Sequence, residues 1–356
     1  MVKIAAARLH PYRLPLRSEW ATAAGSFGWR EGWLLQLATD DGRYGYGDCA
    51  PLPGTGSEST EAAAAALHTE TRKLVGLDAG TALAGLPDPA GCAAPAARCA
   101  VETALLDLLA QAAELPLAHY LQGRHASETV PVNAALGSLM RVEDSAILGA
   151  CGEGFSVLKL KVGTQEVEQE LARLRQIAAL LPAGTLLRLD ANRAWRPADA
   201  ERFLAACAEL PVDMLEEPLA DPQPDALRRL QANCAFALAL DESGPGHAQD
   251  EFFAAAPVRR LVLKPPRLGG LLPALALARR ASAAGLQCIV TSSVDSACGV
   301  LAAAQLAAVL DNGLAHGLAT SSWLAQDTGT PPAIAGGRLS LPGTPGLGFV
   351  PRNKQF

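Results

Sequence analysis

The chain has 356 residues, of which 49% are hydrophobic and 19% charged, and its formal net charge is −6. This composition is typical of a globular protein with a large buried core and excludes intrinsic disorder. The acidic balance without a basic run argues against a nucleic-acid partner, and no apolar stretch is long enough for a membrane span. Charges and prolines interrupt the N-terminus, so we expect a cytoplasmic protein without a signal peptide.

The first part of the chain, residues 1–125, predicts an α+β domain. Residues 3–48 have the pattern of antiparallel strands, with an Asp-Asp-Gly turn at 40–42 between two strand-like runs. Helical spacing of Ala and Leu follows at roughly 58–76 and 94–113. Gly-rich stretches at 22–29 and 51–59 flank the predicted hairpin.

The pattern changes near residue 130, where short apolar runs begin to alternate with helical runs. Eight units of this kind predict a closed parallel barrel over residues 126–325. A doubly wound open sheet is the alternative, although no Gly-x-Gly-x-x-Gly motif follows the first strand. The predicted strands are 130–136, 156–162, 186–192, 213–218, 236–242, 260–265, 287–293 and 316–322. Residues 326–356 are expected to form a C-terminal segment that packs back on the N-terminal domain.

Charged residues stand at the carboxyl ends of five successive predicted strands, where barrels of this kind carry function. They are Lys159 and Lys161, Asp190 with Asn192, Glu216 and Glu217, Asp241 and Glu242, and Lys264. A lone aspartate at a strand end is more often a helix cap, and a lone lysine is usually solvated. The consecutive pattern is hard to produce by chance, so we interpret it as a site.

Neighbouring strands bring three carboxylates to one point, and such a group is stable only around a cation. Oxygen ligands alone favour Mg²⁺, with Mn²⁺ as an alternative. Glu216 and Glu217 cannot both point into the barrel, because adjacent strand residues alternate.

Two lysines are predicted to face each other across this metal site. Lys161 and Lys264 stand four strands apart among eight, hence on opposite sides of the barrel mouth. A metal ion and a second ammonium lower a lysine pKa, so that the amine can act as a base. The arrangement suits removal of a proton next to a carboxylate, with the metal stabilising the resulting enediolate.

Several motifs resemble the enolase superfamily, in its muconate-lactonizing subgroup. They are LKLKVG, LRLDANRAW, LEEPL, ALDES, LVLKPPRLGG and TSSVDSACG. The resemblance implies a modified TIM barrel of (β/α)7β type with an N-terminal α+β capping domain. In that family the capping domain supplies two loops that close over the barrel mouth, and the stretches at 22–29 and 51–59 match those loops in kind and position.

Within the subgroup, the chain is most similar to the o-succinylbenzoate synthases. That resemblance implies Mg²⁺ ligands at Asp190, Glu216 and Asp241. It implies that Lys161 removes the proton and then protonates the departing hydroxyl, and that Lys264 stays charged and stabilises the enediolate. The implied reaction is a syn dehydration that yields 2-succinylbenzoate, a step in menaquinone synthesis.

The supporting residues are less sharply defined by the sequence. Lys159 would help to lower the pKa of Lys161. Ser292 and Ser293 precede a helix that begins near Ser296, and N–H groups there could bind a second substrate carboxylate, or Ser296 and Asp295 could cap that helix. Arg188 and Asn192 share the parity of Asp190 and serve either the site or structural support.

Two other functions remain open at this point. N-succinylamino acid racemases and dipeptide epimerases use the same two lysines, and Arg267 keeps the racemase alternative open as an anion-binding group. The dipeptide epimerases carry an Asp-x-Asp pair at the eighth strand, where this chain has LATSSWL. A catalytically inactive binding protein is the other alternative. Each of the enzymatic functions predicts a small-molecule substrate, which for the synthase is a dicarboxylate. The sequence leaves the oligomeric state open.

Overall fold

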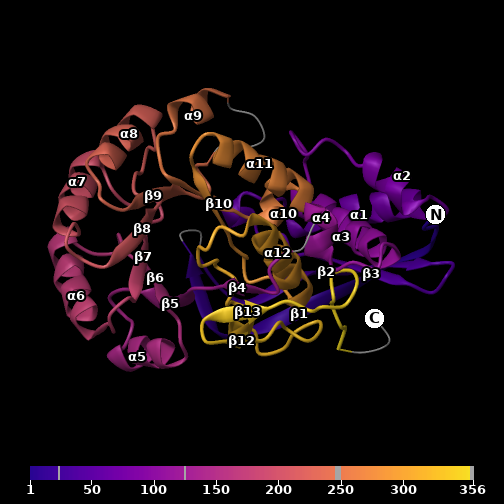
Figure 1. Ribbon diagram of the computed structural model, residues 1–356, viewed down its shortest axis with the longest axis horizontal. Helices are drawn as coiled ribbons and strands as arrows, with labels where there is room; N and C mark the ends of the chain where they lie inside the picture. The colour runs from indigo at the N-terminus through magenta and orange to yellow at the C-terminus, as the bar shows by residue number, and fades with distance from the viewer. Residues whose placement is uncertain (23–24, 124–125, 245–249, 353–356) are drawn as a thin grey trace.

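The computed structural model describes residues 1–22, 25–123, 126–244 and 250–352. Figure 1 shows a strand-rich N-terminal domain beside a curved sheet whose outer side is covered by helices. This architecture confirms the predicted barrel with a capping domain.

The capping domain is a three-stranded antiparallel sheet with helices packed on it. Its helix α3 packs so closely on β3 that only glycine fits at position 47. A Cβ on Gly47 would lie only 1.9 Å from the Ala100 carbonyl oxygen. The predicted turn is present, with Gly42 at φ 86°. The elements are β1 (Ile4–Thr22), β2 (Gly25–Thr39), β3 (Tyr44–Cys49), the 3-10 helix η1 (Pro53–Thr55), α1 (Thr60–Leu74), α2 (Ala79–Ala84), α3 (Pro95–Ala112) and α4 (Leu117–Gln122).

The first of the two predicted capping loops differs from expectation. Over the stretch 22–29, strand pairing continues, with Ala21 opposite Ser26 and Thr22 opposite Gly25. Residues 23–24 lie outside the described residues. The second predicted loop, 51–59, is a true connection and contains η1.

Seven parallel strands form the barrel sheet, in the order β11-β10-β9-β8-β7-β6-β5. Figure 1 shows α5 to α8 along its outer side, so the doubly wound alternative, with helices on both faces, is excluded. The strands are β5 (Ala134–Ser138), β6 (Val157–Lys161), β7 (Leu186–Asp190), β8 (Val212–Glu216), β9 (Ala237–Leu240), β10 (Arg260–Leu263) and β11 (Gln287–Val290).

Two helix boundaries lie where local sequence signals predict them. Pro197 stands in the first turn of α7, and Gly285, at φ 78°, follows the end of α11. The barrel-domain helices are α5 (Asp144–Gly152), α6 (Val167–Leu180), α7 (Pro197–Ala206), α8 (Pro224–Ala232), α9 (Asp250–Ala255), α10 (Pro265–Leu268), α11 (Leu271–Ala283) and α12 (Ala297–Leu310).

Alternation along the strands separates two apolar cores. Outward residues such as Leu158 and Leu160 pack under the helices in the main core. The interior of the barrel holds a smaller cluster that includes Met214, Ala239 and Val262. The inward positions beyond this cluster, at the carboxyl ends of the strands, are polar.

The predicted eighth strand, 316–322, is much shorter than expected. In the described ranges only His316 and Gly317 form bridges, to Val132 and Thr291, and these join the two ends of the sheet. The chain then leaves the ladder and enters the 3-10 helix η2 (Ser321–Trp323), where the Trp323 N–H donates back to Thr320 O (3.0 Å).

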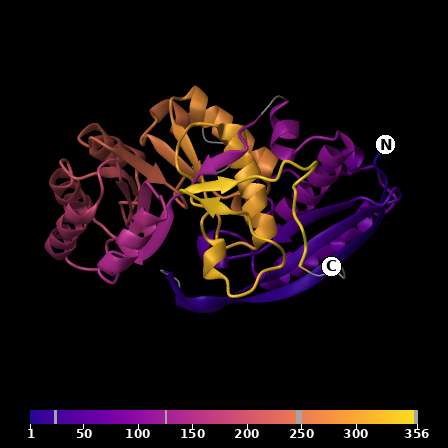
Figure 2. The same cartoon turned by 60° about the horizontal axis from the view of Figure 1, so that its bottom comes forward.

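The C-terminal segment returns toward the capping domain. Phe349 lies edge-on to Tyr46 of β3, with 5.3 Å between the ring centroids, and Figure 2 shows this yellow segment running beside the N-terminal sheet. A small antiparallel sheet joins β12 (Ile334–Ala335), β13 (Arg338–Ser340) and β4 (Thr129–Pro131).

All eight cysteines are free, and all except Cys92 and Cys151 are buried. Among the helices that the structure describes, none combines the length and apolar character needed to cross a lipid bilayer.

Candidate metal and proton-transfer site

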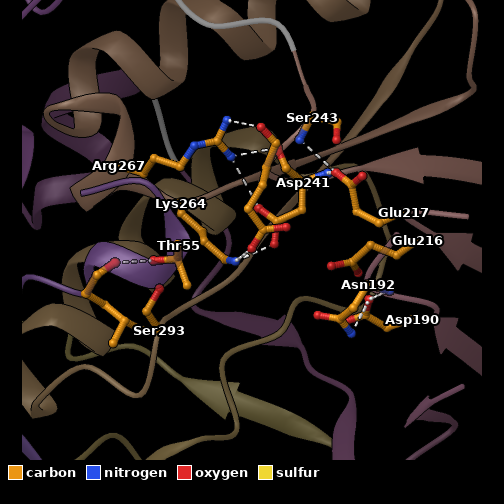
Figure 3. A network of polar contacts seen from close by, with 12 residues as sticks. Thr55, Asp190, Asn192, Glu216, Glu217, Asp241, Ser243, Lys264, Arg267 and Ser293 are labelled. Carbon is orange, nitrogen blue, oxygen red and sulfur yellow. Dashed lines mark hydrogen bonds and ion pairs between the residues drawn. The ribbon is translucent and has the colours of Figure 1, made fainter. Parts of the chain in front are cut away.

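Strand register brings the predicted residues to one end of the barrel. Lys161 pairs with Asp190 across β6 and β7, and Asp190 pairs with Glu216 across β7 and β8. Asp241 directly follows the last residue of β9 and has the inward parity of Ala239. The polar cluster predicted from the strand ends is therefore assembled by the parallel sheet itself, and Figure 3 shows Asp190, Glu216 and Asp241 in one region.

The three carboxylates are buried and paired with ammonium groups. Their residues are 3% to 7% exposed. The Lys159 Nζ lies 3.0 Å from Asp190 Oδ2 and 2.7 Å from Glu216 Oε2, and Lys264 contacts the Asp241 carboxylate. Lys159 thus bridges two of the predicted metal ligands, a closer involvement than the supporting role that the sequence predicts for it.

Burial and charge shift the pKa values of these groups in different directions. Burial and the neighbouring Asp190 raise the pKa of Glu216 to about 8. Burial alone would lower the pKa of Lys159, but the two carboxylates raise it above its usual value. The Lys161 pKa is lowered by burial and by the charges of Lys159 and Lys264, against the opposing effect of Asp190. Of these two lysines only Lys161 has a lowered pKa, the direction that its predicted role as a base requires.

The donor set fits a hard divalent cation. Three buried carboxylates from adjacent strands supply only oxygen, the ligand that Mg²⁺ and Mn²⁺ prefer. Burial first, and then the charges of Asp190 and Asp241, raise the pKa of Glu216, and a bound cation would oppose all of these effects. In the part of the chain that the structure describes, no three acidic, His or Cys side chains stand in a ready-made ligand group. Lys159 and Lys264 contact oxygens of the three carboxylates.

Asn192 and Arg188 have different roles. The Asn192 backbone N–H and Nδ2 both donate to Asp190 Oδ1, at 3.1 and 3.0 Å, so Asn192 orients a predicted metal ligand. Arg188 is 1% exposed and lies deeper in the barrel, where its Nε donates to Asp213 Oδ2 (2.8 Å). Arg188 therefore supports the barrel interior and reaches neither lysine through any contact in the described residues.

Glu217 is a site residue whose role the sequence did not reveal. Its φ of 48° turns it out of the strand, and its Oε1 accepts hydrogen bonds from the backbone N–H groups of Asp241 (2.7 Å) and Ser243 (2.8 Å). Figure 3 shows this connection from Glu217 to the segment that carries Asp241. The only sequence signal was the Glu-Glu pair itself, of which one member had to point away from the barrel interior.

The serine wall beside the site consists of Ser292, Ser293 and Thr320. The hydroxyls of Ser292 and Thr320 lie 2.6 Å apart, and all three residues are buried. Figure 3 draws Ser293 together with Thr55 of η1 on the side of Lys264 away from the carboxylates.

The structure contradicts the predicted anion site at the first two N–H groups at the start of α12, because side chains already occupy them. The Ser296 N–H donates to Asp48 Oδ2 of the capping domain (3.0 Å), and the Ala297 N–H donates to Asp327 Oδ1 (2.8 Å). Capping by Ser296 and Asp295 is also wrong, because Asp295 instead accepts from the Ser293 N–H (3.3 Å). These two N–H groups therefore bind side chains from distant segments of the chain and are not free for a substrate carboxylate.

Arg267 lies against the metal-ligand segment. Its Nη1 donates to the Asp241 carbonyl oxygen (2.6 Å) and its Nη2 to the Glu242 carbonyl oxygen (3.1 Å). A Cβ at Gly56, next to η1, would lie 3.4 Å from Arg267 Cδ. Arg267 therefore joins the strand-end segment to the capping loop.

Known proteins share both parts of this chain. A family model described as "Enolase C-terminal domain-like" matches residues 144–355, and one described as "MenC, N-terminal domain" matches residues 4–90. The structure of a dipeptide epimerase from Methylococcus capsulatus, complexed with Mg and the dipeptide L-Arg-D-Lys, superposes with a TM-score of 0.87 at 30% identity, over 98% of this chain and 99% of that one.

Two curated relatives carry different activities. The N-succinyl-L-Arg/Lys racemase of Bacillus cereus is 27% identical over 83% of this chain and 81% of its own length. The o-succinylbenzoate synthase of Thermosynechococcus vestitus is 33% identical over 65% of this chain and 66% of its own length. The chain therefore belongs to the enolase superfamily, in its muconate-lactonizing subgroup.

Proposed function

We propose that this enzyme is an o-succinylbenzoate synthase, which dehydrates 2-succinyl-6-hydroxy-2,4-cyclohexadiene-1-carboxylate to 2-succinylbenzoate in menaquinone synthesis. The observation that carries this proposal is the MenC-type N-terminal domain over residues 4–90. That domain supplies η1 and Thr55, which lie beside Lys264 at the barrel mouth. The related o-succinylbenzoate synthase also supports it.

In this proposal the two lysines perform the proton transfers and the charge stabilisation. Lys161 removes the proton next to the substrate carboxylate, since burial and two neighbouring ammonium groups lower its pKa. The same amine then protonates the departing hydroxyl on the same face, which makes the elimination syn. Lys264 remains charged, because its pKa is raised by Asp241 and Glu242 against the effect of burial, and it stabilises the enediolate from the opposite side.

The residues that would hold Mg²⁺ are Asp190, Glu216 and Asp241, with Asn192 and Glu217 orienting two of them. A bound Mg²⁺ supplies electrostatic stabilisation of negative charge on the substrate carboxylate. Lys159 lies between two of these carboxylates and limits their mutual repulsion.

The serine wall supports a substrate with a second carboxylate and no amine. Ser292, Ser293 and Thr320 offer hydroxyl groups that can donate to a succinyl carboxylate. A dipeptide epimerase would need acidic side chains near the eighth strand to bind an ammonium group, and residues 316–322 contain none.

N-succinylamino acid racemization is the second candidate. Lys161 ends β6 and Lys264 directly follows β10, four positions away in the sheet, as suits a two-base reaction. A relative with this activity aligns over most of the chain. Arg267 adds a cation at the Lys264 side of the site. An N-succinylamino acid also carries the two carboxylates that the serine wall and the metal site would bind.

Two assays distinguish these candidates. The purified enzyme with Mg²⁺ is incubated with the cyclohexadiene substrate, and the loss of diene absorbance is followed. In parallel, exchange of the α-proton of N-succinylamino acids is followed in D₂O. Rapid dehydration supports the synthase, whereas rapid exchange without dehydration would replace it with the racemase.

A further inference from the structure

Arg30, a residue of the capping domain, joins two walls of the barrel mouth. It lies on β2 and is 3% exposed. Its Nη2 and Nη1 donate to the carbonyl oxygens of Ala50 (2.7 Å) and Pro51 (3.0 Å), at the start of the loop that contains Thr55. Its Nε donates to the carbonyl oxygen of Val294 (3.3 Å), directly after Ser293.

Val294 has a backbone conformation that its side chain disfavours. Its φ is 58°, in the left-handed region, where a β-branched residue is a genuine outlier. Such strain persists only where the surroundings enforce it. The Val294 side chain is fully buried against Leu14 of the capping domain and Leu324, and the Arg30 guanidinium holds its carbonyl group. Both constraints therefore include the capping domain.

The charges around Arg30 hold the guanidinium in place. Asp295 Oδ1 lies 3.9 Å from the Arg30 Nη2, and both side chains are buried. Asp48 accepts hydrogen bonds from the Tyr12 hydroxyl (2.6 Å) and from the Ser296 N–H. Three separate carbonyl acceptors require the fixed planar fork of an arginine, which the single ammonium of a lysine cannot reproduce.

We infer that Arg30 is a positioning residue that holds Val294 in its strained conformation. In this way it fixes Ser293 and the loop 51–59, which contains Thr55, as the two walls that receive the succinyl carboxylate of the substrate, here called the distal carboxylate. This inference rests on the proposed function, because that function supplies the distal carboxylate. Arg30 itself touches neither the predicted metal ligands nor the catalytic lysines among the contacts in the described residues.

The first test measures the backbone mobility of residues 291–296, here called the serine loop, without any substrate. Hydrogen–deuterium exchange of residues 291–296 is compared between the wild type and Arg30→Lys, a variant that keeps the charge and loses the fork. We expect exchange in this segment to accelerate at least tenfold while β6 to β8 keep their protection. Unchanged exchange in residues 291–296 would overturn the inference, whatever the substrate of the enzyme proves to be.

The second test uses kinetics and a double-mutant cycle. Arg30→Met should raise KM for the succinyl substrate about tenfold or more, with kcat changed less than threefold and with Mg²⁺ affinity unchanged in calorimetric titration. Val294→Gly removes the strain, since glycine adopts a positive φ freely, so Arg30→Met should raise KM less in the Val294→Gly background.

Two kinetic results would contradict the inference. One is an equal effect of Arg30→Met in both backgrounds, and the other is a loss of kcat and Mg²⁺ affinity together with KM. If Arg30→Met does not fold, Arg30→Lys takes its place in the same cycle. A wild-type enzyme that dehydrates nothing refutes the proposed function alone, because the exchange measurement on the serine loop still tests Arg30.

Discussion

The carboxylate of Asp48, in the capping domain, accepts a hydrogen bond from the backbone N–H of Ser296, the residue that precedes helix α12 of the barrel domain (3.0 Å). A helix N-terminus is therefore capped across the boundary between two parts of the chain that lie 248 residues apart. This link joins the capping domain to the segment that follows the serine wall.

Asp48→Ala should lower the free energy of unfolding by about 1–3 kcal/mol, because a buried N–H group and the Tyr12 hydroxyl lose their acceptor. Asp48→Asn keeps an acceptor and should cost less. Urea unfolding measures both, with Asp225→Ala at the exposed start of α8 as the control. An Asp48→Ala variant as stable as the control would contradict the role of this cap.

Lys161→Ala and Lys264→Ala should each lower the turnover rate at least about 10²-fold, because one removes the proposed base and the other the fixed positive charge. Mg²⁺ binding, measured by calorimetry, should be retained in both variants. Lys73→Ala, at an exposed ion pair on α1, is the matched control. Retained turnover in either active-site variant would refute its assignment.

Removal of divalent metal with EDTA should abolish activity, and Mg²⁺ or Mn²⁺ should restore it, since three buried carboxylates form the donor set. Mg²⁺ at about 100 times its Kd should stabilise the folded enzyme by about 2.7 kcal/mol, visible as a higher melting temperature. The double variant Asp190→Asn with Glu216→Gln should lose this shift. A shift that survives in the double variant would place the metal elsewhere.

Glu217→Ala should weaken Mg²⁺ binding by about 10- to 100-fold, because Glu217 fixes the backbone of the Asp241 segment through two hydrogen bonds. Glu217→Gln retains an oxygen acceptor in the same place and should weaken binding less. Calorimetric titration with Mg²⁺ measures both. If the two variants bind Mg²⁺ as the wild type does, Glu217 has no part in placing Asp241.

The buried imidazole of His316 should make the folded protein less stable in acid. Burial, with a smaller contribution from Arg188, lowers the pKa of His316 to about 3, and its Nδ1 accepts the Val290 N–H (3.0 Å). Below about pH 6.5 the His316 imidazole binds a proton in the unfolded state but stays neutral in the folded state. The free energy of unfolding therefore falls as the pH falls from about 6.5 toward 3.

The slope from this group approaches about 1.4 kcal/mol per pH unit. His316→Asn removes it, so the stability difference between wild type and variant should shrink between pH 7 and pH 4. Urea unfolding at several pH values in this range measures the difference. A difference that stays constant with pH would show that His316 does not titrate as its burial implies.

Much of the site was predictable because parallel strands in a barrel place their carboxyl ends on one rim. The period-two alternation of FSVLKLKVG fixed which side of β6 carries Lys159 and Lys161. The charges at successive strand ends then indicated a site, and the resemblance to the enolase superfamily singled out Asp190, Glu216, Asp241 and Lys264 within it. Local sequence signals also marked the start of α7 at Pro197 and the end of α11 at Gly285.

Contacts between distant segments were not predictable in this way. The sequence suggested that N–H groups at the start of α12 bind an anion, but Asp48 and Asp327 arrive there from other parts of the chain. Lys159 was expected to lower the pKa of Lys161, and its charge does so, but its ion pairs with Asp190 and Glu216 were not foreseen. Within the described residues, the expected eighth strand 316–322 contributes only two bridged residues before the chain turns into a local 3-10 helix.

By itself, the amino-acid sequence determined the alternation of strands and helices and the side of each strand that is polar. It also indicated the residues that we predict to hold a metal and move a proton. Those properties depend on periodicity and residue chemistry, which are local. The tertiary structure alone decided the partners of Arg30, Asp48 and Glu217, and the strained conformation of Val294. These contacts and this conformation depend on which buried polar groups come together when distant segments pack, as where the capping domain packs on the barrel. A local sequence pattern does not specify contacts between segments that are far apart in the chain.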